Sequence, residues 1–190
     1  MQFNKYKNFF IDILMRINDY DRKSAVDYAV NFALKRNPKY YNFDNLGGNC
    51  TNFVSQCLYA GSKIMNYSPI LGWYYNSLND RAPAWTGVEE LYRFLINNDK
   101  VGPFGRLVNK NQVAIGDVIE LGKNSSDFYH SLIVTKISSE RIFVCSNTHD
   151  TLNVPLDFYS FYNVRYIHIE GVRKPKVSPR VNLNYYLHRR

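Results

Sequence analysis

The hydrophobic pattern changes its period near the middle of the chain, and this change limits the fold more than any other feature. In the first half, apolar residues recur at helical spacing, which predicts helices over residues 4–18, 21–37, 50–60 and 86–97. In the second half, short stretches rich in β-branched and aromatic residues predict strands over residues 117–121, 130–137, 141–147 and 164–170. Helices followed by antiparallel strands predict an α+β domain.

We expect one domain over residues 1–171, because 190 residues can form a single core and no linker precedes residue 172. Residues 172–190 are expected to form a basic tail. After Glu170 the chain has six Lys and Arg and no acid, so the net charge of +8 falls to +2 for the body. A near-neutral body argues against a nucleic-acid partner, whereas the tail suits contact with anionic polymers.

The sequence has neither an apolar run long enough for a membrane span nor a recognisable signal peptide. We therefore expect a cytoplasmic protein, or one exported by a non-standard route. Nothing in the pattern calls for a metal or another cofactor, and we expect a monomer.

Three cysteines are too few, and of the wrong parity, for a disulfide framework in a chain of this length. Cys57 and Cys145 are interpreted as buried apolar residues. Cys50 follows Gly47-Gly48-Asn49 and begins a predicted helix. A helix N-terminus favours a thiolate and offers backbone N–H groups to an oxyanion, so Cys50 is the candidate nucleophile.

A cysteine nucleophile needs a base, and His130 is the best of the four histidines because it opens a strand directly after a loop. If Ser139 and Glu140 form a two-residue turn, the hairpin register places Ile137 opposite Ile142 and His130 opposite His149. Asn147 is then the diagonal neighbour of His130, close enough to orient the imidazole. A three-residue turn would move Asn147 to the other face.

The run Gly47 to Leu58 resembles the hallmark of the putative amidase domain family, a branch of the papain-like cysteine hydrolases related to NlpC-type and CHAP cell-wall enzymes. Further parts of the pattern follow in order over about residues 18–160: Tyr20-Asp21-Arg22, Asn37-Pro38, Gly72-Trp73-Tyr74-Tyr75, Trp85-Thr86, Gly116-Asp117 and His130 with Ile133-Val134-Thr135.

The resemblance implies a papain-like fold with Cys50 as nucleophile, His130 as general base and acid, and a polar third residue on the next strand. Asn147 aligns with that third position, and His149 is a rival for it. The chain departs from the family in having Asn49 where an Asp usually precedes the nucleophile. The oxyanion would receive the backbone N–H of Cys50 and a loop side chain, either Asn45 or Tyr41.

The implied reaction is amide hydrolysis through a thioester, with a peptide or peptidoglycan-like amide as substrate. Trp73, Tyr74, Trp85 and His149 are candidate cleft residues, with aromatic packing against the fourth helix as the alternative. Two other functions remain open: a cysteine acyltransferase or deamidase that uses the same site, and a catalytically degenerate domain that only binds.

Overall fold

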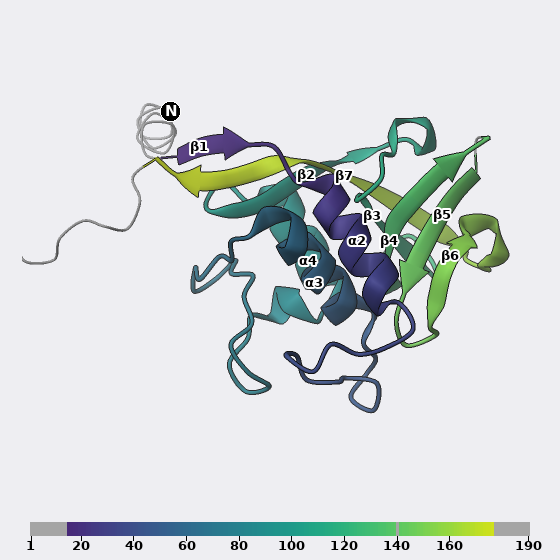
Figure 1. Cartoon of the computed structure of the whole chain (residues 1–190), viewed down its shortest axis with the longest axis horizontal. Helices are drawn as coiled ribbons and strands as arrows, with labels where there is room; N and C mark the ends of the chain where they lie inside the picture. The colour runs from purple at the N-terminus through teal and green to yellow at the C-terminus, as the bar shows by residue number, and fades with distance from the viewer. Residues whose placement is uncertain (1–14, 140, 177–190) are drawn as a thin grey trace, which may run out of the picture.

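The computed structural model describes residues 15–139 and 141–176, which form an α+β fold (Figure 1). Its helices are α2 (Arg22–Phe32), α3 (Cys50–Ser62) and α4 (Val88–Asn97), and three short 3-10 segments cover Pro83–Trp85 (η1), Lys110–Gln112 (η2) and Leu156–Phe158 (η3). The strands are β1 (Met15–Asn18), β2 (Gly102–Val108), β3 (Val118–Gly122), β4 (Phe128–Ser138), β5 (Arg141–Ser146), β6 (Thr151–Pro155) and β7 (Asn163–Pro175).

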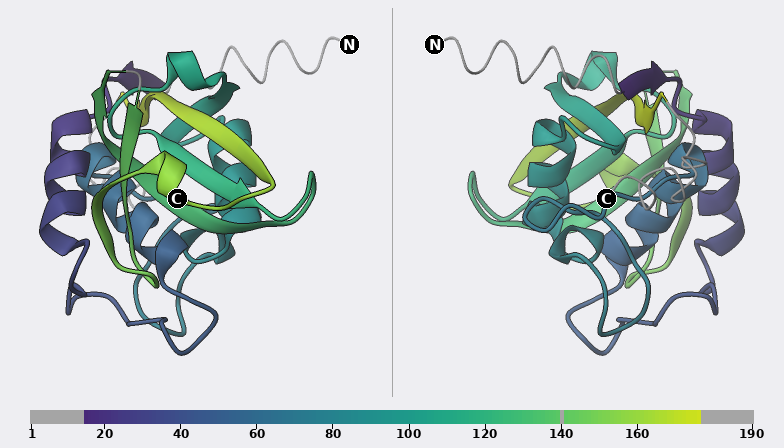
Figure 2. Two further views of the ribbon diagram at one scale, coloured as in Figure 1. Left: turned by 90° about the vertical axis from the view of Figure 1, so that its right-hand side faces the viewer. Right: turned by 90° about the vertical axis from the view of Figure 1, so that its left-hand side faces the viewer.

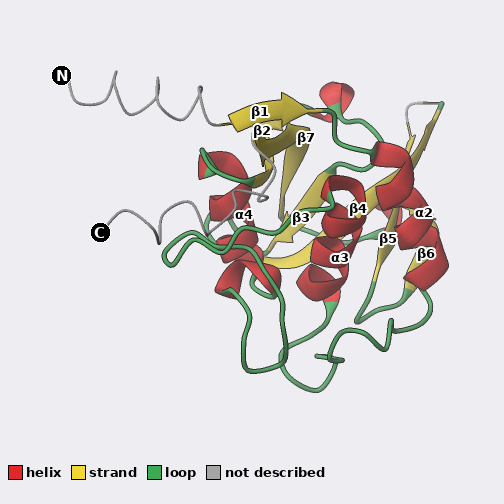
Figure 3. Ribbon diagram, turned by 60° about the vertical axis from the view of Figure 1, so that its left-hand side comes forward, coloured by secondary structure: helices red, strands yellow, loops and turns green. Residues whose placement is uncertain are grey.

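The seven strands form one antiparallel sheet in the order β1-β7-β3-β4-β5-β6, with β2 also paired to β7. Helix α3 lies between α2 and α4 in the view of Figure 3, and the three helices cover one face of the sheet (Figure 2). The predicted α+β class is thereby confirmed. Within the described residues, none of the helices has the length and apolar character needed to cross a bilayer.

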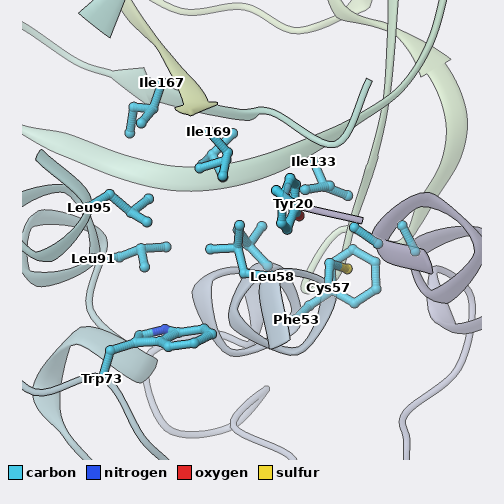
Figure 4. Packing of buried hydrophobic residues seen from close by; sticks show 14 of the residues in the cluster. Tyr20, Phe53, Cys57, Leu58, Trp73, Leu91, Leu95, Ile133, Ile167 and Ile169 are labelled. Carbon is cyan, nitrogen blue, oxygen red and sulfur yellow. The ribbon is translucent and has the colours of Figure 1, made fainter. Parts of the chain in front are cut away.

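Side chains alternate between the two faces of the sheet, and each face has its own core. On the helix face, Phe53, Cys57 and Leu58 of α3 pack with Ile133, Ile167 and Ile169 (Figure 4). On the opposite face, a smaller cluster contains Ile119, Leu121, Leu132, Val134, Ile142, Val144 and Leu156. This division decides which polar residues can meet, because neighbouring residues of one strand point to opposite cores.

Helix α3 is buried over most of its length, including its polar residues. The side chains of Trp73 and Trp85 donate hydrogen bonds to Ser55 (3.0 Å) and Asn52 (2.8 Å). Gly61 lies inside this helix rather than capping it, and a Cβ there would come within 2.3 Å of the Tyr20 ring. Lys63 is the C-cap, so the close approach of the Tyr20 ring, and not a capping role, accounts for the glycine at position 61.

Two predicted helix boundaries need correction. Helix α2 begins as predicted, with the Asp21 carboxylate accepting from the Ser24 N–H (2.9 Å), but it ends at Phe32 rather than near Asn37. Helix α4 begins at Val88 rather than at Thr86, with Gly87 as its N-cap, and Glu89 pairs with Arg165 instead of forming a capping box with Thr86. A salt bridge to the sheet takes the carboxylate that the capping box would have used.

The predictions at the two chain ends also differ from the structure. Residues 15–18 of the helix predicted over 4–18 form strand β1, which pairs with β7, and residues 4–14 lie outside the described residues. Strand β7 continues to Pro175, so the sheet includes the first residues of the segment we expected to be a tail. There, Arg173 donates to the Asn98 carbonyl oxygen (2.6 Å) and lies over the Phe104 ring.

The hairpin of β4 and β5 follows the predicted register only near its turn. Ile137 lies opposite Ile142 as predicted, but an irregularity between Val134 and Lys136 shifts the pairing by one residue. Beyond it, Val134 lies opposite Val144 and Ile133 opposite Cys145. Because a shift of one residue exchanges the two faces of a strand, the predicted neighbours of His130 change as well.

Candidate active site

Cys50 is the first residue of α3 and is 8% exposed. The preceding turn depends on glycine, because Gly47 and Gly48 have φ angles of 88° and 106°. A Cβ on Gly48 would also lie 3.2 Å from Thr148 Oγ1, whereas one on Gly47 would meet nothing within 4 Å. The two glycines bring the chain into α3 close to the loop that follows β5.

The first turn of α3 keeps its backbone N–H groups free of a side-chain cap. Asn49 occupies the N-cap position, but its Oδ1 accepts from the Phe43 N–H (3.1 Å) and from Asn52 Nδ2 (2.8 Å) instead. The first intrahelical bond runs from the Phe53 N–H to the Asn49 carbonyl oxygen, so the N–H groups of residues 50–52 have no partner within the helix. Such a terminus attracts negative charge at the position of the thiol.

Asn147 is buried and binds the turn before Cys50. Its Oδ1 accepts from Asn49 Nδ2 (2.9 Å), and its own Nδ2 donates to the Ala33 carbonyl oxygen (2.9 Å). The adjacent Thr148 Oγ1 accepts from the Asn49 backbone N–H (2.6 Å). Asn147 therefore lies on the helix side of the sheet and joins the end of α2 to the turn.

His130 lies on the opposite face of the sheet. Its backbone is paired with Leu121, a residue of the smaller core, and its ring lies 6.0 Å from that of Tyr159. Its Nε2 is 2.9 Å from Ser146 Oγ. The predicted contact with Asn147 was wrong, because the shifted register places Ser146, and not Asn147, on the same face as His130.

The hydrogen bonds around Ser146 define the state of the imidazole. The Ser146 hydroxyl donates to the Asn147 carbonyl oxygen (2.9 Å), so its oxygen is left to accept from a protonated Nε2. Nδ1 is then the unprotonated nitrogen. Burial, with a smaller contribution from nearby His149, lowers the pKa of His130 to about 4. The ring is therefore neutral near pH 7.

Helix α3 and strand β4 are in contact through the residues that follow Cys50 and His130. Thr51 Oγ1 and Ser131 Oγ lie 3.0 Å apart, and each belongs to the residue that follows a predicted catalytic one. Among residues 15–139 and 141–176, no hydrogen bond joins Cys50 Sγ to the imidazole; the thiol lies 3.8 Å from Thr51 Oγ1.

The other predicted site residues are distributed differently. Trp73 and Trp85 are fully buried in the helix-side core, so their prediction as cleft residues is wrong and the packing alternative holds. Tyr74 is half-buried and stacks on Tyr67 at 4.6 Å. Asn45 is exposed and precedes Cys50 in the sequence by five residues. His149 is also exposed and lies close enough to His130 to contribute to its lowered pKa.

Arg36 joins the loops on either side of the site, a role that the sequence analysis missed. Its guanidinium binds Asp44, in the loop before Cys50, and Asp150, in the loop after β5, with closest distances of 2.9 and 2.8 Å. Ser146, Thr148 and Ser131 were missed as well. In the sequence these three residues are marked only by being next to Asn147 or His130. That position does not show which residue each hydroxyl binds or on which face of the sheet it lies.

All three cysteines are free and buried, which agrees with the interpretation that an odd number of cysteines does not form a disulfide framework. In the described part of the chain, His, Cys, Asp and Glu side chains form no group of three that could hold a metal ion. The groups that the described residues bring to this site include a thiol, an imidazole, several hydroxyls and the uncapped N–H groups of α3.

Together these features define an α+β domain whose candidate active site is centred on a cysteine at a helix N-terminus. The chain belongs to the family described as "Putative amidase domain", whose model matches residues 19–169. The family resemblance inferred from the cysteine motif is confirmed.

Two curated relatives come from Bacillus subtilis (strain 168). The uncharacterized protein YhbB is 34% identical over 140 residues, which cover 72% of this chain and 44% of YhbB. The uncharacterized protein YjcM is 25% identical over 150 residues, which cover 75% of this chain and 34% of YjcM. The chain thus matches less than half the length of either relative. No solved structure matches it.

Proposed function

We propose that this protein is a cysteine-dependent amide hydrolase with a papain-like arrangement of its catalytic groups. The observation that carries the proposal is the position of Cys50, at the start of a buried helix whose first N–H groups are uncapped. Membership of the amidase family supports the class of reaction. The Thr51–Ser131 contact supports the pairing of this helix with the strand of His130.

In the proposed reaction, Cys50 Sγ attacks the amide carbonyl carbon while His130 takes the thiol proton at Nδ1. The carbon–nitrogen bond then breaks, His130 returns the proton to the leaving amine, and water hydrolyses the thioester. The Cys50 N–H stabilises the oxyanion. Asn45 remains our predicted second donor, because its exposed side chain lies on the loop before the nucleophile.

In the proposed reaction the thiol proton of Cys50 reaches Nδ1 of the imidazole through bridging water, because His130 stays bound to Ser146 Oγ. Catalytic hydrogen bonds are often loose in free enzymes and tighten when substrate binds. Ser146 supports this role because it fixes the proton on Nε2 and leaves Nδ1 as the acceptor. We assign Asn147, predicted to orient the imidazole, to positioning the Asn49 turn instead.

The substrate class we propose is a peptide or peptidoglycan-like amide bound by a monomer. Tyr41 (42% exposed) and Tyr129 (40% exposed) are available for contact with it, together with His149. Tyr41 is tied to α3 by its carbonyl oxygen, which accepts from Asn52 Nδ2 (3.2 Å), and the Tyr129 ring lies 6.3 Å from that of His130.

The test is release of amines from a panel of muropeptides and acyl-peptide amides. Wild-type protein is compared with Cys50→Ser, which keeps the shape of the side chain, and with Ser62→Ala, a buried control at the other end of α3. We expect amine release by the wild type and Ser62→Ala but not by Cys50→Ser. Equal release by all three, or none by the wild type from any substrate, would contradict the proposal.

A second candidate, a degenerate domain that binds peptides without cleaving them, is favoured by one observation. The imidazole faces away from α3 and is held by Ser146. In that case, the same panel would show saturable binding without turnover, and Cys50→Ser would bind as tightly as the wild type.

A further inference from the structure

Three buried asparagines form a hydrogen-bonded chain that includes the residue before Cys50. Asn49, Asn52 and Asn147 are each at most 2% exposed. Asn52 Nδ2 donates to Asn49 Oδ1 (2.8 Å), and Asn49 Nδ2 donates to Asn147 Oδ1 (2.9 Å). We call these three residues the asparagine chain. Its side chains are all neutral amides, so it carries no charge into the site.

The two ends of the asparagine chain are fixed by groups that can act in only one way. The indole Nε1 of Trp85 can only donate, and it donates to Asn52 Oδ1 (2.8 Å). The carbonyl oxygen of Ala33 can only accept, and it accepts from Asn147 Nδ2 (2.9 Å). Neither terminal amide can therefore be turned end for end, and hydrogen bonds are donated in one direction along the chain.

The orientation of Asn49, in the middle of the chain, is fixed in the same manner. Its Oδ1 accepts from the backbone N–H of Phe43 (3.1 Å), so its Nδ2 must face Asn147 Oδ1. Residue 49 must therefore offer a hydrogen to residue 147. An ionised Asp has none to offer. This requirement accounts for an amide at the position where the family pattern usually has Asp.

The charged groups nearby are engaged elsewhere. The asparagine chain joins residues 32–36, 41–44, 50–52, 83–87 and 147–150, whose titratable side chains are Lys35, Arg36, Tyr41, Asp44, Cys50, His149 and Asp150. The guanidinium of Arg36 binds both carboxylates, and the Lys35 ammonium lies over the Phe32 ring. Among the described residues, no hydrogen bond or ion pair joins any of these charged side chains to the side chain of Asn49.

We propose that Asn49, held between Asn52 and Asn147, is a positioning residue that fixes the turn before Cys50 and keeps this turn uncharged. Without a carboxylate at position 49, the free N–H groups of residues 50–52 can stabilise a thiolate unopposed. No bond is made or broken along the asparagine chain. The inference rests on the proposed function only in treating Cys50 as the reactive thiol, and its test measures unfolding and alkylation, so either proposal can fail without the other.

The first measurement is urea unfolding of Asn49→Asp at two pH values. At about pH 7.5 the new carboxylate directs an oxygen at Asn147 Oδ1, so two acceptors meet without a hydrogen between them. A protonated carboxyl group has an O–H to donate and restores the chain. The folded variant thus binds this proton more tightly than the unfolded chain, so its stability relative to wild type should rise as the pH falls.

We expect the difference in urea midpoint between Asn49→Asp and wild type to shrink by at least about half from pH 7.5 to pH 4.5. Comparison with wild type at each pH removes the contribution of His130, which both proteins share.

The second measurement is the rate of Cys50 alkylation by iodoacetamide between pH 6 and 9, with the modified cysteine located by mass spectrometry. A carboxylate on the preceding residue disfavours the thiolate. In Asn49→Asp the rate at about pH 7.5 should therefore fall by about 10-fold, and the profile of rate against pH should move to higher pH.

A buried asparagine outside the chain provides the matched control. Asn98 donates from Nδ2 to the Pro103 carbonyl oxygen (2.9 Å), and its Oδ1 accepts from Asn66 Nδ2 (3.2 Å). Asn98→Asp should also lose stability at about pH 7.5 and recover it in acid, but Cys50 should be alkylated at the wild-type rate. This control separates a role at the site from the general cost of a buried carboxylate.

A second variant within the chain keeps the test decisive if Asn49→Asp does not fold at about pH 7.5. In Asn147→Asp the new oxygen faces the Ala33 carbonyl oxygen, so acid should restore stability here too, and alkylation should slow less than in Asn49→Asp. The proposal is wrong if the loss of stability in the variant that folds is the same at both pH values. Alkylation of Asn49→Asp at the wild-type rate, or equal slowing in Asn98→Asp, would also overturn it.

Discussion

Ser146 Oγ lies 2.9 Å from His130 Nε2, on the face of the sheet opposite α3. The same hydroxyl donates to the Asn147 carbonyl oxygen, so it can only accept from the ring. This pair fixes the neutral tautomer with the proton on Nε2, and it gives the proposed base its orientation.

Replacement of Ser146 should weaken the proposed base without unfolding the protein. In Ser146→Ala the Nε2 proton loses its acceptor and the other tautomer becomes accessible, so amide hydrolysis should fall by about 10-fold or more, with kcat affected more than KM. Ser146→Thr, which retains the hydroxyl, should recover most of the rate. An unchanged kcat in Ser146→Ala would show that the His130–Ser146 contact has no part in catalysis.

Buried His130 makes stability depend on pH. Its pKa of about 4 in the folded protein lies below the usual value near 6.5, so the unfolded state binds more protons between these values. Stability should therefore fall as the pH drops from about 6.5 towards 4, with about 3 kcal/mol lost once the ring is protonated. Urea unfolding at several pH values measures this loss.

His130→Gln should remove that part of the pH dependence, whereas His149→Gln, a change at an exposed histidine, should leave most of it. If wild type and His130→Gln lose the same stability between pH 6.5 and 4, the neutral buried imidazole is not the cause.

The turn before Cys50 offers a matched pair of glycine substitutions. Gly47→Ala and Gly48→Ala both place an alanine at positive φ, but only the second meets Thr148 Oγ1, at 3.2 Å. Each should cost about 1–2 kcal/mol in backbone strain, and Gly48→Ala should cost more and reduce Cys50 alkylation further. Equal effects on unfolding and on alkylation would argue against a role for the Thr148 contact in positioning Cys50.

Arg36 should matter for the geometry of the site more than for stability. It is partly exposed, so its two ion pairs should contribute only about 1 kcal/mol to unfolding, but Arg36→Ala should release the loops that carry Asp44 and Asp150 and raise KM. Arg141→Ala removes a comparable ion pair with Asp157, away from Cys50, and is the control. If Arg36→Ala and Arg141→Ala have the same KM, Arg36 does not hold the two loops in position for substrate binding.

Much of the fold could be predicted from the local sequence, because α2 and α3 carry apolar residues at helical spacing, and β3 and β4 are short runs rich in β-branched residues. Strands β2 and β6 could not, since β2 contains two glycines and a proline and β6 is only five residues long. The end of α2 was overestimated because the pattern after Phe32 stays compatible with a helix.

The site shows the same division between local and long-range information. The Gly47-Gly48 turn and the helix start at Cys50 are local features, and both were predicted. The partner of His130 depends on one irregularity between Val134 and Lys136, which no local pattern marks. The burial of Trp73 and Trp85 is also a long-range feature, because their N–H groups donate to Ser55 and Asn52 of α3, and it favours packing over the cleft role.

The proposed function requires that Cys50 form a covalent acyl intermediate. We would mix the protein with a peptidyl p-nitroanilide, quench with acid within a turnover, and measure the intact mass and the modified peptide. We expect an acyl adduct on Cys50 that is absent in Cys50→Ser and present in Ser62→Ala. Release of p-nitroaniline with no adduct on Cys50, or at an equal rate in Cys50→Ser, would contradict it.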